Sequence, residues 1–268
     1  MPDAKSAQTP VARGRIEYLR SVRIVFEHPQ WMKGLLMLAV SMLIPVLSTP
    51  VLFGYMYEVT EHLHLRQPGP YPLFEFRRFA HYITRGIWCY LLMNMLVAIL
   101  VPIVQVVFQG GFFASIAALQ SRNNVAGLIV AVAVPAVLTA FFAFLLALSI
   151  LLTPLYLRAG LTHDFAQTFN FRWVGDFVRR MWLEVLLVNL FQWLASLVLL
   201  PLGCVMFCYG MLLAAALLSI SSGQLNWQLY ELYLTRGGEP IPLRPVNVAH
   251  AASVGATNVS GDAGSVDY

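Results

Sequence analysis

The chain has 268 residues, of which 59% are hydrophobic and 11% are charged, and its formal net charge at pH 7 is +4. Soluble domains contain about 45–50% apolar and about 25% charged residues. The composition excludes an ordinary soluble fold, an intrinsically disordered chain and a small disulfide-stapled protein, because too little charge is present to cover a surface in contact with water. We therefore expect an integral membrane protein.

Residues 1–33 form a basic segment, and residues 34–57 form the first run without Asp, Glu, Lys or Arg. In the basic segment, arginines stand beside apolar residues in a way that is typical of a helix on a membrane surface. Pro45 and Pro50 interrupt the apolar run. The pattern leaves open whether this run spans the membrane or enters it and returns to the same side.

Three longer runs without charge follow, at residues 86–121, 123–157 and 185–230. A helix needs about 20 apolar residues to cross the roughly 30 Å hydrocarbon core of a bilayer. We predict four spanning helices, at residues 87–108, 127–152, 183–200 and 204–221. A tight hairpin at Pro201-Leu202-Gly203 would join the last two. The runs lack the alternation of apolar and polar residues that β-barrel strands show.

The basic residues decide between membrane topologies, because cytoplasmic loops carry the excess of Lys and Arg. If the run at 34–57 re-enters, residues 1–33, 58–86, 153–181 and the tail lie inside. Arg122 is then the only basic residue that lies outside. If that run spans with the N-terminus inside, two arginine-rich loops fall outside. Five spans with an external N-terminus rank second. We expect an inner-membrane protein with four spans and both termini in the cytoplasm.

An internal repeat appears when the chain is shifted by 95 residues. Phe74-Glu75-Phe76-Arg77 then aligns with Phe169-Asn170-Phe171-Arg172, and seven of the 21 positions from 74 to 94 are identical. Each copy reads as an amphipathic interfacial helix followed by a hairpin of two spans. We predict an all-α fold with two parallel units, related by a pseudo-twofold axis along the membrane normal.

These patterns divide the chain into five parts. They are a basic segment at 1–33, a re-entrant or spanning segment at 34–57, a first repeat unit at 58–157, a second repeat unit at 158–236 and a disordered tail at 237–268.

Four arginines of the repeat are candidates for contact with lipid. They are Arg77, Arg85, Arg172 and Arg180. Guanidinium groups at the headgroup level meet lipid phosphate, while neighbouring aromatic rings bury in the interface. We therefore expect these side chains to bind anionic headgroups.

Two repeat-equivalent amides, Asn94 and Asn189, lie inside predicted spans, and Gln105 and Gln192 lie deeper in the same spans. Amides in a membrane most often join helices by hydrogen bonds. They could also line a permeation path. Glu184 is the one carboxylate within a predicted span, and its position beside basic residues favours an ion pair at the interface over a proton-coupled role.

Metal, cofactor and enzyme motifs are weak or missing in the sequence. His62, His64 and His81 share a predicted loop with Glu58, Glu61 and Glu75, but no tetrad is defined, so we expect solvated histidines and no metal. Cys204 and Cys208 are expected to be packing residues. No phosphate loop, dinucleotide fingerprint, HExxH or GxSxG motif is present. We expect no cofactor, no enzymatic activity and no nucleic-acid binding.

Several short motifs resemble those of domain-of-unknown-function family 4013, a group of prokaryotic multi-span membrane proteins. They are Glu27-His28-Pro29-Gln30-Trp31, Gly54-Tyr55, Tyr71-Pro72-Leu73-Phe74-Glu75-Phe76, Gly86, Asp164-Phe165-Ala166-Gln167-Thr168-Phe169 and Gly223-Gln224. The resemblance covers residues 26–230. At Phe74 and Glu75 the family tends to have more carboxylates. The resemblance implies a polytopic membrane protein and no catalytic residue.

Two functions fit the sequence. The first is a non-enzymatic membrane module that organises lipids or partner proteins through its cytoplasmic interfacial helices. The second is a transporter or channel subunit with a path between the duplicated hairpins, which the absence of charge at mid-membrane disfavours.

Overall fold

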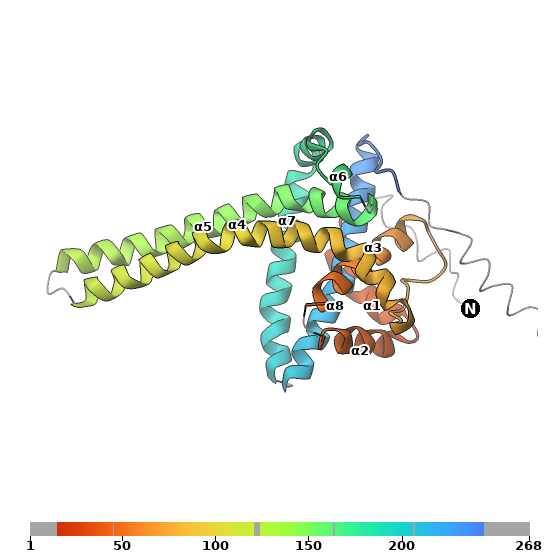
Figure 1. Ribbon diagram of the computed structural model, residues 1–268, viewed down its shortest axis with the longest axis horizontal. Coiled ribbons are helices and arrows are strands. Elements are labelled where there is room, and N and C mark those ends of the chain that lie inside the picture. The colour runs from red at the N-terminus through yellow and green to blue at the C-terminus, as the bar shows by residue number, and fades with distance from the viewer. Residues whose placement is uncertain (1–14, 45, 121–123, 163, 206, 244–268) are drawn as a thin grey trace, which may run out of the picture.

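The computed structural model describes residues 15–243, apart from residues 45, 121–123, 163 and 206. Within this part the chain forms helices and no strand, which confirms the predicted all-α class (Figure 1). The helices are α1 (Tyr18–Glu27), α2 (Trp31–Ser41), α3 (Ser48–His64), the short 3₁₀ helix η3 (Phe76–Arg78), α4 (Phe79–Gln120), α5 (Asn124–Thr162), α6 (Phe165–Thr168), α7 (Phe171–Val205) and α8 (Phe207–Thr235). The predicted tail lies mostly outside the described residues.

Three stretches of the described chain are long and apolar enough to cross a membrane. They are Phe76–Phe113, Val132–Thr162 and Phe171–Val205. In the most apolar 18-residue window of each stretch, at most 11% of the residues are buried within the chain, as expected for helices that face lipid. The protein is therefore an all-α polytopic membrane protein. The predicted fourth span, 204–221, includes residue 206, which lies outside the described residues, and it stays a prediction.

The first apolar run, 34–57, does not form one helix. It is divided between α2 and α3, which are separated by a turn where Val46 adopts a positive φ of 68°. α3 continues to His64, so the predicted boundary at residue 57 falls inside a helix. The boundary at residue 157 likewise falls inside α5.

The hairpin between α7 and α8 lies further along the chain than predicted. α7 continues through Pro201 to Val205, so the expected break at 201–203 is wrong. The two helices cross closely where glycines face each other, because a Cβ atom on Gly203 would lie 2.7 Å from the backbone of Gly210.

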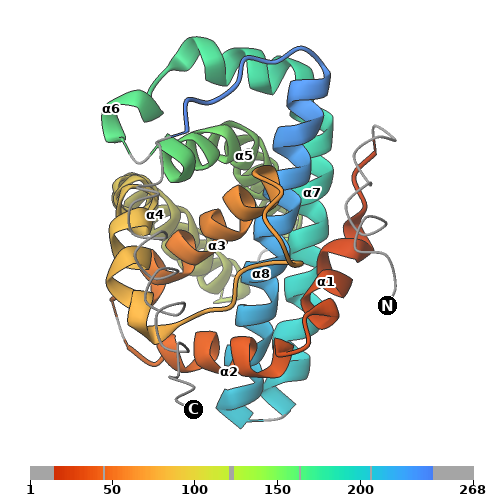
Figure 2. The ribbon, with the colours of Figure 1, turned by 90° about the vertical axis from the view of Figure 1, so that its right-hand side faces the viewer.

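The predicted interfacial helices are not separate elements. η3 runs directly into α4, and the second copy of the motif forms the first turns of α7. Figures 1 and 2 show that α4 and α7 both change direction after these first turns.

The two long hairpins point in different directions. The hairpin of α4 and α5 projects away from the rest of the molecule, whereas α7 and α8 run within it (Figure 1). The predicted pseudo-twofold axis along the membrane normal is not evident in this arrangement, and the internal repeat stays a prediction.

α3 lies between two buried clusters of apolar side chains. Its Tyr55 belongs to a cluster with α1, α2, α4 and α8, while its Tyr57 belongs to a second cluster with α4, α5, α7 and α8. Figure 2 shows α3 enclosed by these helices. α1 is attached to α8 by a 2.8 Å hydrogen bond between the hydroxyls of Ser21 and Ser221.

α3 and α4 cross at two glycines. A Cβ atom on Gly54 would lie 1.9 Å from the carbonyl oxygen of Tyr82, and one on Gly86 would lie 1.9 Å from the carbonyl oxygen of Pro50. No side chain larger than hydrogen fits at either position without moving a backbone, so these glycines set the distance between the helices.

We expect Gly54→Ala and Gly86→Ala each to lower stability by about 1–3 kcal/mol, because overpacking at this crossing forces the backbones apart. The matched control is Gly110→Ala, since a Cβ at Gly110 meets nothing within 4 Å and alanine is favoured in a helix. Thermal unfolding of the detergent-purified protein measures the difference. Equal unfolding temperatures for the three variants would contradict the close crossing.

Candidate membrane-surface site

Residues 71–75 form the last part of the connection between α3 and η3, and tyrosine hydroxyls hold this segment in place. The Tyr71 hydroxyl donates to the carbonyl of Val25 at 2.9 Å, and the Tyr55 hydroxyl donates to the carbonyl of Pro72 at 2.8 Å. Burial raises the pKa of Tyr71 to about 12, so this hydroxyl keeps its proton at neutral pH. The segment is therefore tied to both α1 and α3.

The buried side chain of Phe74 also holds this segment in place. Its ring is buried, stacks on Tyr82 with centroids 4.9 Å apart and meets the edge of Tyr55 at 5.5 Å. The backbone N–H of Glu75 donates to the Tyr82 hydroxyl at 3.3 Å. As a result, the neighbouring Glu75 and Arg77 project from a fixed backbone.

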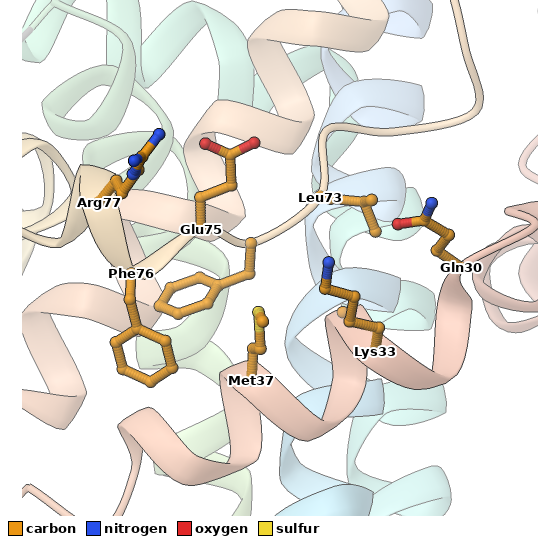
Figure 3. Close-up of a pocket in the computed structure, with 9 residues that line it drawn as sticks. Gln30, Lys33, Met37, Leu73, Glu75, Phe76 and Arg77 are labelled. Atoms are coloured by element: carbon orange, nitrogen blue, oxygen red, sulfur yellow. The ribbon is translucent and has the colours of Figure 1, made fainter.

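A pocket of about 370 Å³ separates this segment from α2. It is lined by Gln30, Lys33, Gly34, Met37, Leu73, Phe74, Glu75, Phe76 and Arg77. Figure 3 shows Lys33 projecting from α2 and Glu75 and Arg77 projecting from the opposite wall. A Cβ atom on Gly34 would lie 3.0 Å from the Leu73 side chain, so the glycine allows the two walls to meet at one end.

Two of the four predicted lipid-facing arginines are exposed and free of acidic partners within the described residues. Arg77 and Arg172 each occupy the second position of a membrane-length stretch. Arg180 is also exposed, but it pairs with Asp176 at 2.8 Å, and the Tyr233 hydroxyl donates to the same carboxylate at 3.0 Å. Burial and this hydrogen bond raise the pKa of Tyr233 to about 12, so the hydroxyl remains a donor.

The prediction for Arg85 is wrong. Its side chain is only 4% exposed, forms an ion pair with Glu61 of α3 and donates to the carbonyl of Tyr57 at 3.0 Å. Beside it, Arg78 pairs with Glu58 at 2.6 Å. The sequence placed these acids in a loop, but both lie on one face of α3. Their three-residue spacing on a helix, and the seven-residue spacing of the arginines, could have indicated facing rows of charge.

The predicted polar pair within the membrane is not brought together. Asn94 is exposed and donates to the carbonyl of Tyr90 on its own helix at 2.8 Å, and Gln105 is exposed as well. On α7, Asn189 donates to the Thr153 hydroxyl of α5 at 3.2 Å. In this copy the amide joins two helices, as the sequence favoured.

Gln192 and Glu184 also make contacts between helices. The side-chain oxygen of Gln192 accepts from the Ser222 hydroxyl of α8 at 2.9 Å. Glu184 is paired with Arg236, which follows α8, rather than with the arginines that precede it on α7. The sequence thus identified an ion pair but not the partner.

The predicted histidine loop is largely helical. His62 is buried, which contradicts the expected solvation, and its Nδ1 lies 2.9 Å from the side-chain oxygen of Gln67. His64 lies 2.6 Å from Glu231 and so joins α3 to α8. No group of three or more His, Cys, Asp or Glu residues in the described ranges is arranged to hold a metal ion.

Comparison with known proteins identifies a family. The profile of the family described as "Protein of unknown function (DUF4013)" matches residues 37–220, which is more than two thirds of the chain. The chain belongs to this family. The DUF4013 match covers α3 and the three membrane-length stretches, and it ends within α8. No curated protein and no solved structure matches the chain.

The buried position of Arg85 gives a test within this DUF4013 protein. Arg85→Leu leaves Glu61 buried without its partner and should lower stability by about 3–5 kcal/mol. Arg77→Leu, at an exposed and unpaired position, should change it by about 0.5 kcal/mol or less. Thermal unfolding in detergent measures both changes. The double variant Arg85→Leu/Glu61→Leu should recover much of the lost stability. Equal losses of stability in Arg85→Leu and Arg77→Leu would contradict the buried pair.

Proposed function

We propose that this protein is a non-enzymatic membrane module that organises anionic lipids, or partner proteins, at one face of the membrane through exposed basic side chains. Its ligands would be lipid headgroups rather than nucleic acid, and it would need no cofactor.

The observation that carries the proposal is the placement of Arg77 and Arg172. Both are exposed, both lack an acidic partner in the described chain, and both follow the first residue of a membrane-length stretch. A basic side chain at the end of a spanning helix lies at the level of lipid phosphates. Exposed Lys33, Arg66 and Arg179 likewise have no ion pair among the described residues.

The alternative function, a transporter or channel subunit, has less support. It places Asn94 and Gln105 along a path between the two hairpins. Both side chains are exposed on α4 rather than enclosed between helices. The contacts of Asn189 and Gln192 with neighbouring helices are those of residues that hold helices together.

We also propose that the protein lies in the inner membrane with both termini in the cytoplasm. The support is the charge distribution, because this topology places nearly all basic residues inside.

Lipid binding tests the proposed function. In native mass spectrometry of the detergent-purified full chain, Arg77→Gln/Arg172→Gln should weaken phosphatidylglycerol binding by up to about 30-fold, since each basic residue near an anionic surface contributes about 1 kcal/mol. The matched control is Arg23→Gln/Arg180→Gln, which removes the same charge from arginines already paired with Glu27 and Asp176. Equal losses of phosphatidylglycerol affinity in the two variants, or no loss in either, would count against the proposal.

Thiol labelling tests the sidedness. Single cysteines at Gln67, Ser121 and Gln167, in a variant without the three native cysteines, are probed with a membrane-impermeant reagent. Gln67 and Gln167 are exposed in the structure, so both should react once the cells are opened. In intact cells only the cysteine at 121, which lies outside the described residues, should react. Labelling at 67 or 167 in intact cells would place the basic face outside.

A further inference from the structure

The pocket between α2 and the segment that leads into η3 is lined by charged side chains of both signs. Lys33, Glu75 and Arg77 line one pocket, yet none of them forms an ion pair within the described part of the chain. Figure 3 shows the acid and one base on one wall and the other base on the opposite wall. The lining of this pocket therefore offers charges of both signs to a ligand.

The outer surface beside the pocket is apolar. α2 leaves Met32, Leu36 and Val40 exposed at helical spacing, and Leu43 is exposed in the turn that follows. Phe76, on the opposite wall, is also exposed. The ligand that fits this site has apolar chains attached to its charged group, which is the chemistry of a membrane lipid.

The charged wall is built before any ligand arrives. Phe74 is buried beneath it, and the hydroxyls of Tyr55 and Tyr71 fix the backbone that carries Glu75. Little conformational entropy is lost when a ligand binds to such a wall. The volume of about 370 Å³ is at the lower end of ligand pockets, which suits a headgroup and not a whole lipid.

We propose that this pocket binds the headgroup of one phosphatidylethanolamine molecule. Lys33 and Arg77 interact with the phosphate, Glu75 accepts hydrogen bonds from the primary ammonium, and the acyl chains lie over Phe76 and the exposed row of α2. The proposal rests on the proposed function only in placing this end of the molecule at the headgroup level.

The acid decides which lipid is preferred. A choline headgroup has no N–H to donate to Glu75, and a glycerol headgroup has no positive charge to meet it. A purely anionic headgroup is attracted by the two bases, but it places a second negative charge next to the Glu75 carboxylate. The ethanolamine headgroup matches all three charges.

The test is a titration of the delipidated, detergent-purified full chain with phosphatidylethanolamine, phosphatidylcholine and phosphatidylglycerol, followed by native mass spectrometry. The wild type should bind phosphatidylethanolamine about ten-fold more tightly than phosphatidylcholine, as expected for a hydrogen bond between charged groups. Glu75→Gln should abolish this preference and strengthen phosphatidylglycerol binding. Lys33→Gln should weaken the binding of all three lipids.

The matched control is Glu239→Gln, which removes one exposed carboxylate outside the pocket and should leave the preference unchanged. A preference that is absent in the wild type, or that survives Glu75→Gln, would overturn the assignment. Soluble phosphoethanolamine should compete only weakly. If it displaces the lipid at equal concentration, the site takes a soluble ligand and the lipid assignment is wrong.

The same titration separates this proposal from the general one. If Arg77→Gln/Arg172→Gln weakens phosphatidylglycerol binding but Glu75→Gln changes nothing, only the pocket assignment fails. If Glu75→Gln abolishes the preference for phosphatidylethanolamine while Arg172→Gln, outside the pocket, leaves phosphatidylglycerol binding unchanged, only the basic-surface proposal fails.

Discussion

The close crossing of α3 and α4 is the constraint on which the rest of the structure depends. Gly54 and Gly86 bring the two backbones together, and this contact seals Arg85 against Glu61 away from solvent. A buried ion pair adds little net stability, but the loss of either partner is costly, so the pair favours a single register of the helices. Because α4 is fixed at this point, the wall that ends in Arg77 is fixed with it.

Much of the fold could be predicted from where charge is missing. Long charge-free runs are sufficient to indicate helices, because lipid requires every backbone group to be paired within its own segment. The break between α7 and α8 could not be placed, since whether Pro201 ends a helix depends on packing against α8. The turn between α2 and α3 was likewise ambiguous, because α3 is held by contacts with α4 and α8 that are distant in sequence.

The candidate site could be predicted only in part, because the same motif lies in two different environments. Arg77 and Arg172 are exposed at the starts of their helices, as a linear count of charge suggests. Arg85 and Arg180 align in sequence, yet one is buried under α3 and the other is exposed beside Asp176. A single sequence does not indicate which face of α4 receives α3. The amides at 94 and 189 diverge for the same reason.

The distribution of acids, more than the net charge, determines the chemistry of the surface. Several carboxylates pair with arginines elsewhere in the fold: Glu58 and Glu61 pair with arginines of η3 and α4, and Glu184 pairs with Arg236. Each of these acids is matched by its own arginine, so bases such as Arg77 and Arg172 keep their charge, and a chain with a modest positive charge presents a basic surface beside apolar helices. Glu75 differs from these acids, because it is exposed among bases and unpaired within the described chain. An acid in that position makes the pocket discriminate between headgroups, whereas the bases alone would select only for negative charge.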